Sequence, residues 1–392
     1  MPAGAASDLA TLARSVLGAR QGVYVEAGDG SVLLAQLASR AVHPASVSKV
    51  PTTLALLRQL GPEYRFTTTV AASGPVNAGL LEGDLVLVGG GDPYFVDENA
   101  LLVSARLREL GVQRVAGTLR LSGPMLFNWQ EGDLTARLRA TLTGQAPQAA
   151  WDQVRATYPA LRSAADPRPP ALEFADAQPG AGTGAAAVTP LLVHRSQPLV
   201  PLVKALNDYS NNIFKPLADA AGGAAAVQAL ARAAVPESMR DEIVLGDGAG
   251  TDARNRLSPR AAVRLLRALE RELASSGHQL VDILPVAGVD DGTLHDRLNS
   301  AADRGCVVGK TGTFGDYGAS ALIGALRSRD HGTVYFAILN HGVPVSTARR
   351  RQDVFVHALL ANLHCQPWDY VRDERPAVAR AQVLPATAAE SQ

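Results

Sequence analysis

The chain has 392 residues, of which 47% are hydrophobic and 19% charged, and its 37 basic and 37 acidic side chains cancel. This composition is typical of a globular protein with a sizeable core, and the length allows two or three domains. Without a basic excess, a charged tail or a run of 18 apolar residues, the sequence favours neither nucleic-acid binding nor a membrane-spanning helix.

The first elements predicted along the chain are a helix, a hairpin and a second helix. Residues 6–20 have helical apolar spacing, and the alternating residues 22–37 break at Gly28–Gly30, which predicts a hairpin. Residues 43–61 (HPASVSKVPTTLALLRQLG) carry an apolar face that Gly61 ends. This order suggests a sheet packed against helices.

From Phe66 the chain changes character, and we expect an inserted, small, mostly β domain over residues 66–190. Short strand patterns surround one helix near 97–110. Residues 143–190 are rich in Ala, Pro and Gly, and PGAGTGAAA at 179–187 reads as a flexible connection. The surrounding residues, 1–65 and 191–392, would then form the main domain.

The third section regains strong patterning. Its predicted elements are a helix over 198–223 interrupted near Ser210–Asn212, a capped amphipathic helix over 258–273, three strands in series within 305–340, and a closing helix over 351–364. Strands in series are typical of an antiparallel meander.

The cysteines and histidines give no metal-site pattern. Cys306 and Cys365 are far apart and form no CxxC, and the eight histidines show no paired-ligand spacing. We therefore expect neither a zinc site nor another cofactor, and buried free thiols rather than a disulfide.

Ser46 and Lys49 could act as a nucleophile and its base. Residues three apart lie on the same helix face, and a serine hydroxyl attacks only when a neighbouring base takes its proton. Lysine can do so if burial or a nearby cation lowers its pKa. SxxK is common by chance, however, and the plain alternative is a capping serine followed by a solvated lysine.

Two further segments could contribute to the same site. Ser210-Asn211-Asn212 interrupts an apolar helix, either as an ordinary turn or because the polar groups are used. Lys310-Thr311-Gly312-Thr313 follows an apolar run and precedes a strand pattern. Gly312 would let a substrate approach the backbone closely, whereas the plain alternative is a strand end with Lys310 in solvent.

Taken together, SxxK, SxN and KTG in this order resemble the motif set of penicillin-binding proteins and serine β-lactamases. Ser210 follows Ser46 by 164 residues, and Lys310 follows Ser210 by 100. The chain is most similar to the D-alanyl-D-alanine carboxypeptidase/endopeptidase group of peptidase family S13, which includes penicillin-binding protein 4. The stretches that carry the resemblance are PASVSKV (44–50), RFTTTV (65–70), GDLVLVGGGDP (83–93), GVQRVAGTL (111–119), HRSQPL (194–199), SNN (210–212), GDGAG (246–250), NRLSP (255–259), LPVAGVDDGTL (284–294) and GKTGT (309–313).

The resemblance implies a serine DD-peptidase mechanism. Ser46 would attack the penultimate D-alanine carbonyl of a peptidoglycan stem peptide, and Lys49 would take its proton. Ser210 would pass a proton to the leaving amine, Asn212 would orient Lys49 and the substrate amide, and Lys310 would supply positive charge. Thr311 and Thr313 would bind the terminal carboxylate beside Gly312, and the backbone N–H groups of Ser46 and Thr313 would form the oxyanion hole. β-Lactam antibiotics would acylate Ser46.

The resemblance also implies a fold and a location. The fold would be α+β, a five-stranded antiparallel sheet flanked by helices, with a helical part and the inserted domain. The site would lie between the strand of Lys310 and the helix that begins at Ser46. Residues 1–20 lack the basic start and apolar core of a signal peptide, so the chain either stays in the cytoplasm or begins after a removed signal. A peptidoglycan substrate favours a periplasmic or other extracytoplasmic location and an exported precursor.

Departures from the family leave two alternatives open. The stretch between Ser46 and Ser210 allows only a reduced insertion, Ala249 replaces a common serine, and Lys215 replaces a common carboxylate. A β-lactamase or esterase on the same fold would need an efficient deacylating water, and no ExxxN segment or YxN triplet indicates one. A non-catalytic homologue would retain the fold alone. The sequence does not decide the oligomeric state.

Overall fold

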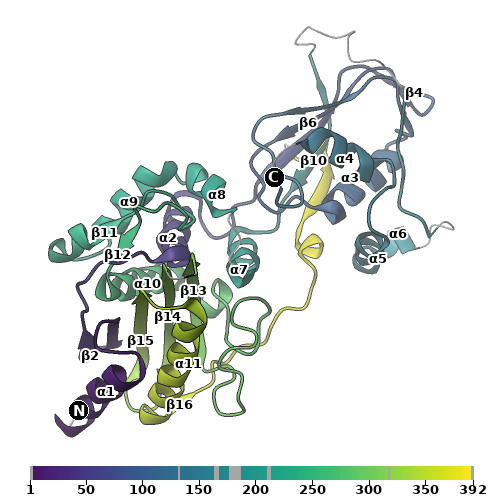
Figure 1. The fold of residues 1–392 in the computed structure, drawn as a ribbon. Coiled ribbons are helices and arrows are strands. Elements are labelled where there is room, and N and C mark those ends of the chain that lie inside the picture. Colours follow the sequence, from purple (N-terminus) through teal and green to yellow (C-terminus); the bar gives the residue numbers. More distant parts are fainter. Residues whose placement is uncertain are drawn as a thin grey trace. The chain divides into compact units, whose positions relative to one another are not determined.

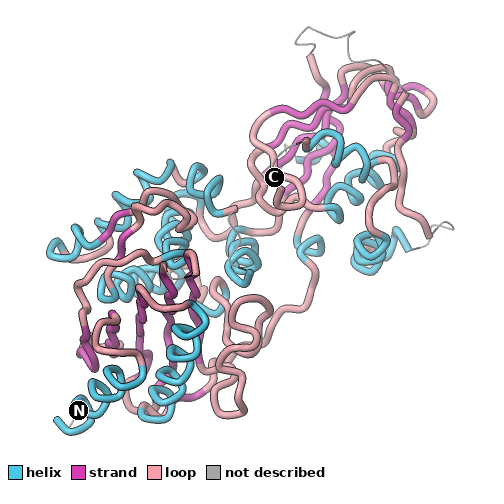
Figure 2. Tube along the Cα trace, viewed as in Figure 1, coloured by secondary structure: helices cyan, strands magenta, loops and turns pink. Residues whose placement is uncertain are grey.

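The computed structural model describes residues 3–130, 133–162, 167–175, 187–209, 213–316 and 318–389. These residues divide into two compact units. Unit 1 comprises Met1–Glu63 and Val203–Asp373, and unit 2 comprises Tyr64–Leu202 and Glu374–Gln392. Each unit is described by itself (Figures 1 and 2).

Unit 1 contains the expected five-stranded antiparallel sheet. Its strands, in spatial order, are β13 (Val307–Phe314), β14 (Ala319–Ser328), β15 (Gly332–His341), β1 (Gly22–Ala27) and β2 (Val32–Gln36). The two-residue strand β16 (Cys365–Gln366) adds to the far end of β14. The sheet thus joins the two ends of the sequence, because β1 pairs with β15, and β13 is left at an edge.

Helices cover both faces of this sheet. α11 (Val345–Asn362) and α1 (Ala3–Val16) pack on one face (Figure 1). Their apolar side chains share a core with β13–β15 and β1. α10 (Pro259–Ala274) and α2 (Lys49–Leu60) lie on the other. α10 matches its predicted range because Ser258 caps it through Ala261 N and its leucines recur at helical spacing on the buried face.

The remaining described elements of unit 1 are α8 (Phe214–Ala220), α9 (Gly223–Ala233), β11 (Ile243–Val244), β12 (Arg256–Leu257), and the 3-10 helices η1 (Ala45–Ser48), η2 (Glu237–Glu242) and η3 (Leu280–Asp282). Among them, α8 and α9 contact α2. α7 (Leu199–Tyr209) begins in unit 2 and ends in unit 1. The interruption expected after residue 209 separates α7 from α8, and Ser210–Asn212 themselves lie outside the described residues.

Unit 2 has its own sheets and core. One sheet has the order β17 (Gln382–Pro385), β10 (Thr189–Arg195), β3 (Thr67–Ala72), β6 (Leu85–Gly89) and β8 (Leu119–Ser122). A second, made of short strands, consists of β4 (Val76–Asn77), β5 (Leu80–Leu81), β7 (Arg114–Val115) and β9 (Glu173–Phe174). The helices are α3 (Asp97–Glu109), α4 (Leu134–Leu142), α5 (Gln148–Thr157), α6 (Pro159–Arg162), η4 (Ala377–Arg380) and α12 (Ala386–Ala389).

Unit 2 differs from the expected insertion in two respects. It is not mostly β, because α3, α4 and α5 bury apolar side chains such as Trp151 and Val154 in its core. It also extends beyond residues 66–190. The C-terminal strand β17 pairs with β10 and so brings residues 374–392, expected in the main domain, into unit 2. The proposed flexible connection at 179–187 lies almost wholly outside the described residues.

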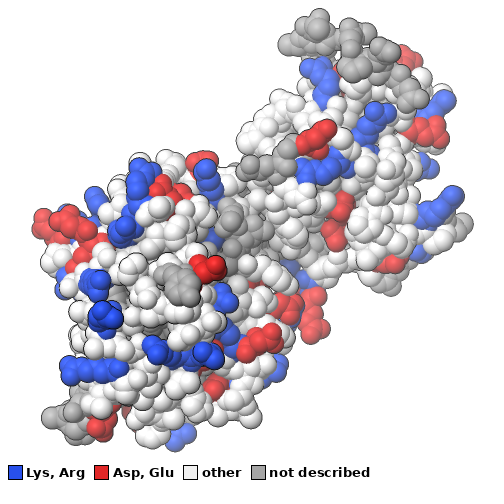
Figure 3. Space-filling view, in the orientation of Figure 1, with Lys and Arg blue, Asp and Glu red and all other residues white. Residues whose placement is uncertain are grey.

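The surface carries charges of both signs, and the two cysteines form no disulfide. Acidic and basic side chains are interspersed over the face displayed in Figure 3. Both cysteines are free, and Cys306 is buried as expected, whereas Cys365 is only partly buried. Burial raises the pKa of each thiol.

Candidate active site

Ser46 lies in η1, which leads directly into α2. From His43 to Leu57 every residue is buried except Ser46, which is partly exposed. Ala45, directly before it, has φ 50°, in the left-handed region that residues with a Cβ rarely adopt. Such strain persists only where the surrounding structure enforces it. Here the strained residue precedes the accessible hydroxyl of an otherwise buried segment.

Lys49 lies at the start of α2 and is fully buried. Its Nζ donates to Ser46 Oγ at 2.7 Å and to the Ala249 carbonyl at 3.0 Å. Burial lowers the pKa of Lys49 to about 8, against the opposing effect of Asp247. The amine therefore becomes neutral slightly above neutral pH, and it is then placed to accept the serine proton.

The edge strand β13 lies beside η1 and carries Lys310. The Lys310 side chain is fully buried and donates to the Thr311 carbonyl at 3.2 Å. Burial, and then the charge of Lys49, hold its pKa well below the usual range. Gly312 makes the close approach possible, since a Cβ there would lie 2.6 Å from the Pro44 oxygen and 3.1 Å from Ser46 N.

The hydroxyls of Thr311 and Thr313 belong to the other face of β13, because side chains alternate along a strand. Thr311 Oγ1 donates to Thr293 Oγ1 at 2.9 Å. Thr313 is exposed, and its hydroxyl accepts from the Arg349 guanidinium at 2.7 Å. The structure therefore brings Ser46, Lys49, Lys310 and Gly312 together and places the two threonines at the adjoining rim.

Ser210 and Asn212 lie outside the described residues, but the helix before them is anchored beside β13. Thr293 N donates to the Asp208 carbonyl at 2.8 Å, and the Thr293 hydroxyl meets Thr311. Lys204, also on α7, donates to Asp290 Oδ2 at 2.5 Å. The segment 284–294 thus links the end of α7 to the strand of Lys310.

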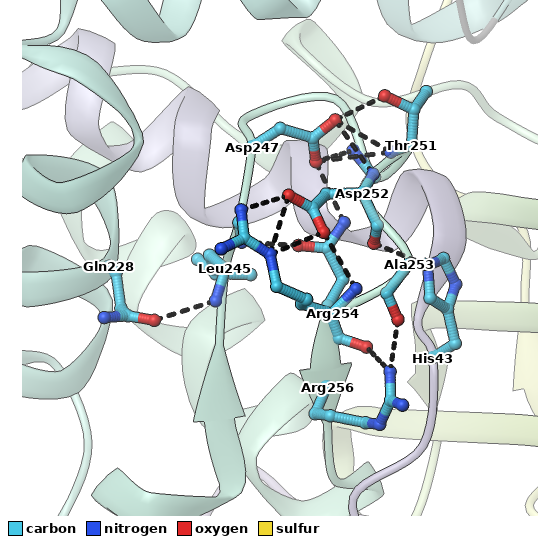
Figure 4. A network of polar contacts seen from close by, with 12 residues as sticks. His43, Gln228, Leu245, Asp247, Thr251, Asp252, Ala253, Arg254 and Arg256 are labelled. Atoms are coloured by element: carbon cyan, nitrogen blue, oxygen red, sulfur yellow. Dashed lines mark hydrogen bonds and ion pairs between the residues drawn. The ribbon is translucent and has the colours of Figure 1, made fainter.

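Sequence reasoning missed His43, three residues before Ser46. His43 Nδ1 accepts from Ala45 N at 3.1 Å, so Nε2 carries the hydrogen. Nε2 donates to the Asp252 carbonyl at 3.0 Å (Figure 4). Its ring stacks on Phe314 with centroids 4.0 Å apart. Burial lowers the pKa of His43. The neutral imidazole thereby joins η1, the turn at Asp252 and the end of β13, contacts that no local pattern indicates.

A pocket of about 300 Å³ opens beside this histidine. Arg40, Arg256, His43, His341 and Phe314 contribute to its lining. Because Phe314 directly follows Thr313, the pocket adjoins the end of β13 and is rich in groups that attract anions.

The described residues contain neither a cluster of metal ligands nor a helix that could span a membrane. Within those ranges, no three His, Cys, Asp or Glu side chains gather as metal ligands would. In the same part of the chain, no helix combines the length and apolarity needed to cross a bilayer.

A reachable serine bonded to a buried lysine, beside the edge of an antiparallel sheet, is equipped for serine-based acyl transfer. The chain belongs to the D-Ala-D-Ala carboxypeptidase 3 (S13) family, whose model matches residues 6–142 and 178–362. It is therefore a serine-type peptidase, as the motif set predicts.

Relatives and solved structures agree with this assignment. The carboxypeptidase DacB of Mycolicibacterium smegmatis is 29% identical over 375 residues, covering 85% of this chain and 78% of that protein. A penicillin G-acylated predatory endopeptidase of Bdellovibrio bacteriovorus, solved with an immunity protein, has a TM-score of 0.75 at 20% identity and covers 93% of this chain and 99% of its own. Penicillin-binding protein 4 of Haemophilus influenzae has a TM-score of 0.62 at 19% identity, with coverages of 92% and 99%. The structural likenesses confirm the expected penicillin-binding fold.

Proposed function

We propose that this peptidase cleaves the terminal D-alanyl-D-alanine bond of peptidoglycan stem peptides through an acyl-enzyme on Ser46. The observation that carries the proposal is the 2.7 Å bond between Lys49 Nζ and Ser46 Oγ, made by a lysine whose pKa is lowered to about 8. Such a lysine can take the hydroxyl proton as the oxygen attacks a carbonyl. The family membership supports the choice of bond.

The other site residues would act on the substrate and the leaving group. Lys310 supplies positive charge when it is protonated, and Thr311 and Thr313 bind the terminal carboxylate, assisted by Arg349 through its bond to Thr313. The substrate backbone approaches β13 at Gly312, where the strand edge can pair with an extended peptide. The N–H groups of Ser46 and Thr313 form the oxyanion hole.

The SxN pair completes this scheme. Ser210 passes the proton to the leaving amine, and Asn212 orients Lys49 and the substrate amide. The family membership supports these two roles.

The same chemistry extends to β-lactams and to cross-linked wall peptides. β-Lactams would acylate Ser46 and leave slowly, since a β-lactam is an acyl donor that mimics the peptide. Endopeptidase action on cross-links requires only a larger leaving amine. Both substrates place the working enzyme outside the cytoplasm, where peptidoglycan lies.

The basic pocket beside Phe314 suits a carboxylate of the stem peptide, because Arg40 and Arg256 both line it. Replacing Arg256 by Gln should then raise KM for an acidic stem peptide and leave acylation by a neutral penicillin ester unchanged.

Intact-mass measurement after incubation with a penicillin tests the proposal. The wild type should gain one penicillin, and Ser46→Ala should gain none. Ser48→Ala is the matched control, since Ser48 lies in the same 3-10 helix but is fully buried. It should still be acylated. Release of D-alanine from a pentapeptide ending in D-Ala-D-Ala should follow the same pattern.

Two results would favour the alternatives. Penicillin consumed without a lasting adduct would identify a β-lactamase or esterase on this fold. Intact penicillin, no adduct and no D-alanine release would indicate a homologue that binds without catalysis.

A further inference from the structure

The turn formed by residues 247–252 lies along the start of α2. Its successive residues contact positions of η1 and α2 that are three residues apart. The Gly248 carbonyl accepts from Thr52 Oγ1 at 2.9 Å, and the Ala249 carbonyl accepts from Lys49 Nζ at 3.0 Å. Gly250, with φ +86°, passes so close to η1 that a Cβ would lie 2.9 Å from Ser46 N. Three successive turn residues therefore contact positions 52, 49 and 46, one helical turn apart each time.

One carboxylate closes this turn (Figure 4). Asp247 Oδ1 accepts from Gly250 N and from Asn255 Nδ2, both at 2.9 Å. Its Oδ2 accepts from the N–H and the hydroxyl of Thr251, at 2.9 Å and 2.5 Å. These bonds hold the pKa of Asp247 below its usual value despite burial, so the group stays ionised.

We propose that Asp247 is a positioning residue for the Ser46–Lys49 pair: it fixes the turn whose carbonyl holds Lys49, and its charge stabilises the ammonium that forms when Lys49 takes the serine proton. Asp247 belongs to none of the three catalytic motifs. Its effect is transmitted through Ala249 and Gly250 and through the field at Lys49.

The charges around Lys49 make this effect measurable. Within the described part of the chain, Asp247 is the carboxylate that raises the pKa of Lys49, and the centroid of the Phe214 ring of α8 lies 5.6 Å from Nζ. Lys49 itself lowers the pKa of the buried Lys310 on β13. Asp208 on α7 acts on Lys310 in turn. Removing the charge of Asp247 therefore leaves burial, which favours neutral Lys49, without the carboxylate that opposes it.

The composition offers a direct measurement. The chain contains only four lysines, Lys49, Lys204, Lys215 and Lys310, so ¹³C labelling at lysine Cε gives four NMR signals, assignable by replacing each with arginine. In the wild type, Lys49 should titrate near pH 8. In Asp247→Asn it should titrate about one pH unit lower, the usual size of a lost neighbouring charge.

Two further variants sharpen the test. Asp247→Ser also removes the charge, but its hydroxyl oxygen can still accept hydrogen bonds from the backbone of the turn. This variant therefore controls for misfolding of Asp247→Asn. Asp252→Asn is the matched control, because this carboxylate belongs to the same turn but pairs outward with Arg254 at 2.5 Å. Asp247→Ser should behave like Asp247→Asn, and Asp252→Asn should titrate like the wild type.

Kinetics supply the second readout. The wild-type rate of acylation by a penicillin should rise as the pH rises through about 8, because Lys49 must lose its proton to act as base. In the two Asp247 variants this rise should move to lower pH, and the plateau should fall at least tenfold, since a weaker base is left without its counter-charge. The kinetic arm rests on the proposed function, whereas the NMR titration does not require Ser46 to react.

Folded Asp247 variants whose Lys49 titrates at the wild-type pH would overturn the proposal. So would failure of both variants to fold, because Asp247 would then be needed for the fold itself. A wild type that shows the expected titration but no acylation would instead reject the proposed function and leave the positioning role standing.

Discussion

Asp92 and His194 are two ionisable side chains buried in unit 2, with Oδ2 and Nδ1 3.7 Å apart. They come from the GGGDP and HRSQPL stretches. Burial raises the pKa of Asp92 to about 7 and lowers that of His194 to about 3, so each is held neutral. Between about pH 4 and 6.5 the folded pair keeps one proton on Asp92, and the unfolded pair keeps one on histidine. The two contributions to pH dependence therefore cancel.

Asp92→Asn should make the stability of unit 2 sensitive to acid. His194 then acts alone: its folded pKa is lowered, so the unfolded state takes up a proton first, and stability is lost as the pH falls from about 6.5 towards 3. The slope should approach about 1.4 kcal/mol per pH unit. Thermal unfolding across this range measures it.

His194→Asn is the opposite control for the same pair. With only Asp92 left, stability should fall as the pH rises from about 4 to 7. If stability changed with pH in the same direction in both variants, the buried pair would not be the source of the pH dependence.

At the scale of the elements, the turn at Gly250 requires glycine for two reasons. Its backbone has a positive φ, and there is no room for a Cβ. Gly250→Ala should lower the free energy of unfolding by about 2 kcal/mol or more, because φ is +86° and the new Cβ would lie 2.0 Å from the Ala45 oxygen. Acylation of Ser46 should slow at least tenfold as η1 is displaced. Denaturant unfolding and acylation rates test both effects.

Gly277→Ala separates the two reasons. Gly277 also has positive φ, +78°, but its Cβ would meet nothing within 4 Å. The free energy of unfolding of Gly277→Ala should fall by only about 1 kcal/mol, and its acylation rate should be unchanged. If both variants lost equally, close packing against Ala45 would not matter.

Elements with strong local signals, such as caps and regular apolar spacing, could be predicted from the sequence. α10 has a capping serine and leucines at helical spacing, and β13–β15 are apolar runs separated by short turns. The Ser46–Lys49 contact follows from a three-residue spacing in one helical turn. In contrast, α4 and α5 were missed because Ala, Pro and Gly obscure the spacing of residues such as Trp151 and Val154.

Contacts between distant segments could not be read in this way. Asp247 acts on a lysine almost 200 positions earlier, and only an aspartate among glycines hinted at a tight turn. Arg349 meets Thr313 from α11, where an arginine in an exposed helix looks ordinary. Tertiary packing decides such partners, and a single sequence carries no record of it.

At the scale of the whole molecule, the last residues of the chain belong to unit 2. Val378 and Val383 are buried in its core, and Tyr158 donates to the Val378 carbonyl at 2.9 Å. Deleting residues 374–392 should therefore destabilise unit 2 by about 3 kcal/mol, from the loss of these two buried valine side chains alone. Its calorimetric transition should fall by on the order of 10 °C.

The acylation rate provides the control for this deletion. Unit 1 ends at Asp373 and contains Ser46, Lys49 and Lys310, so penicillin acylation should remain within about twofold of wild type. Loss of acylation with an unchanged calorimetric transition would contradict the division into units.

The pairing of β1 with β15 has a consequence for synthesis. Gly22–Ala27 can pair with the adjacent strand β2 soon after it is made, yet its other partner strand comes more than 300 residues later, at Val334–Leu339. Unit 2 must wait still longer, for β17 at Gln382–Pro385. Each sheet can therefore be completed only after these late strands have been made, and until then β1 and β10 each lack one of their neighbours.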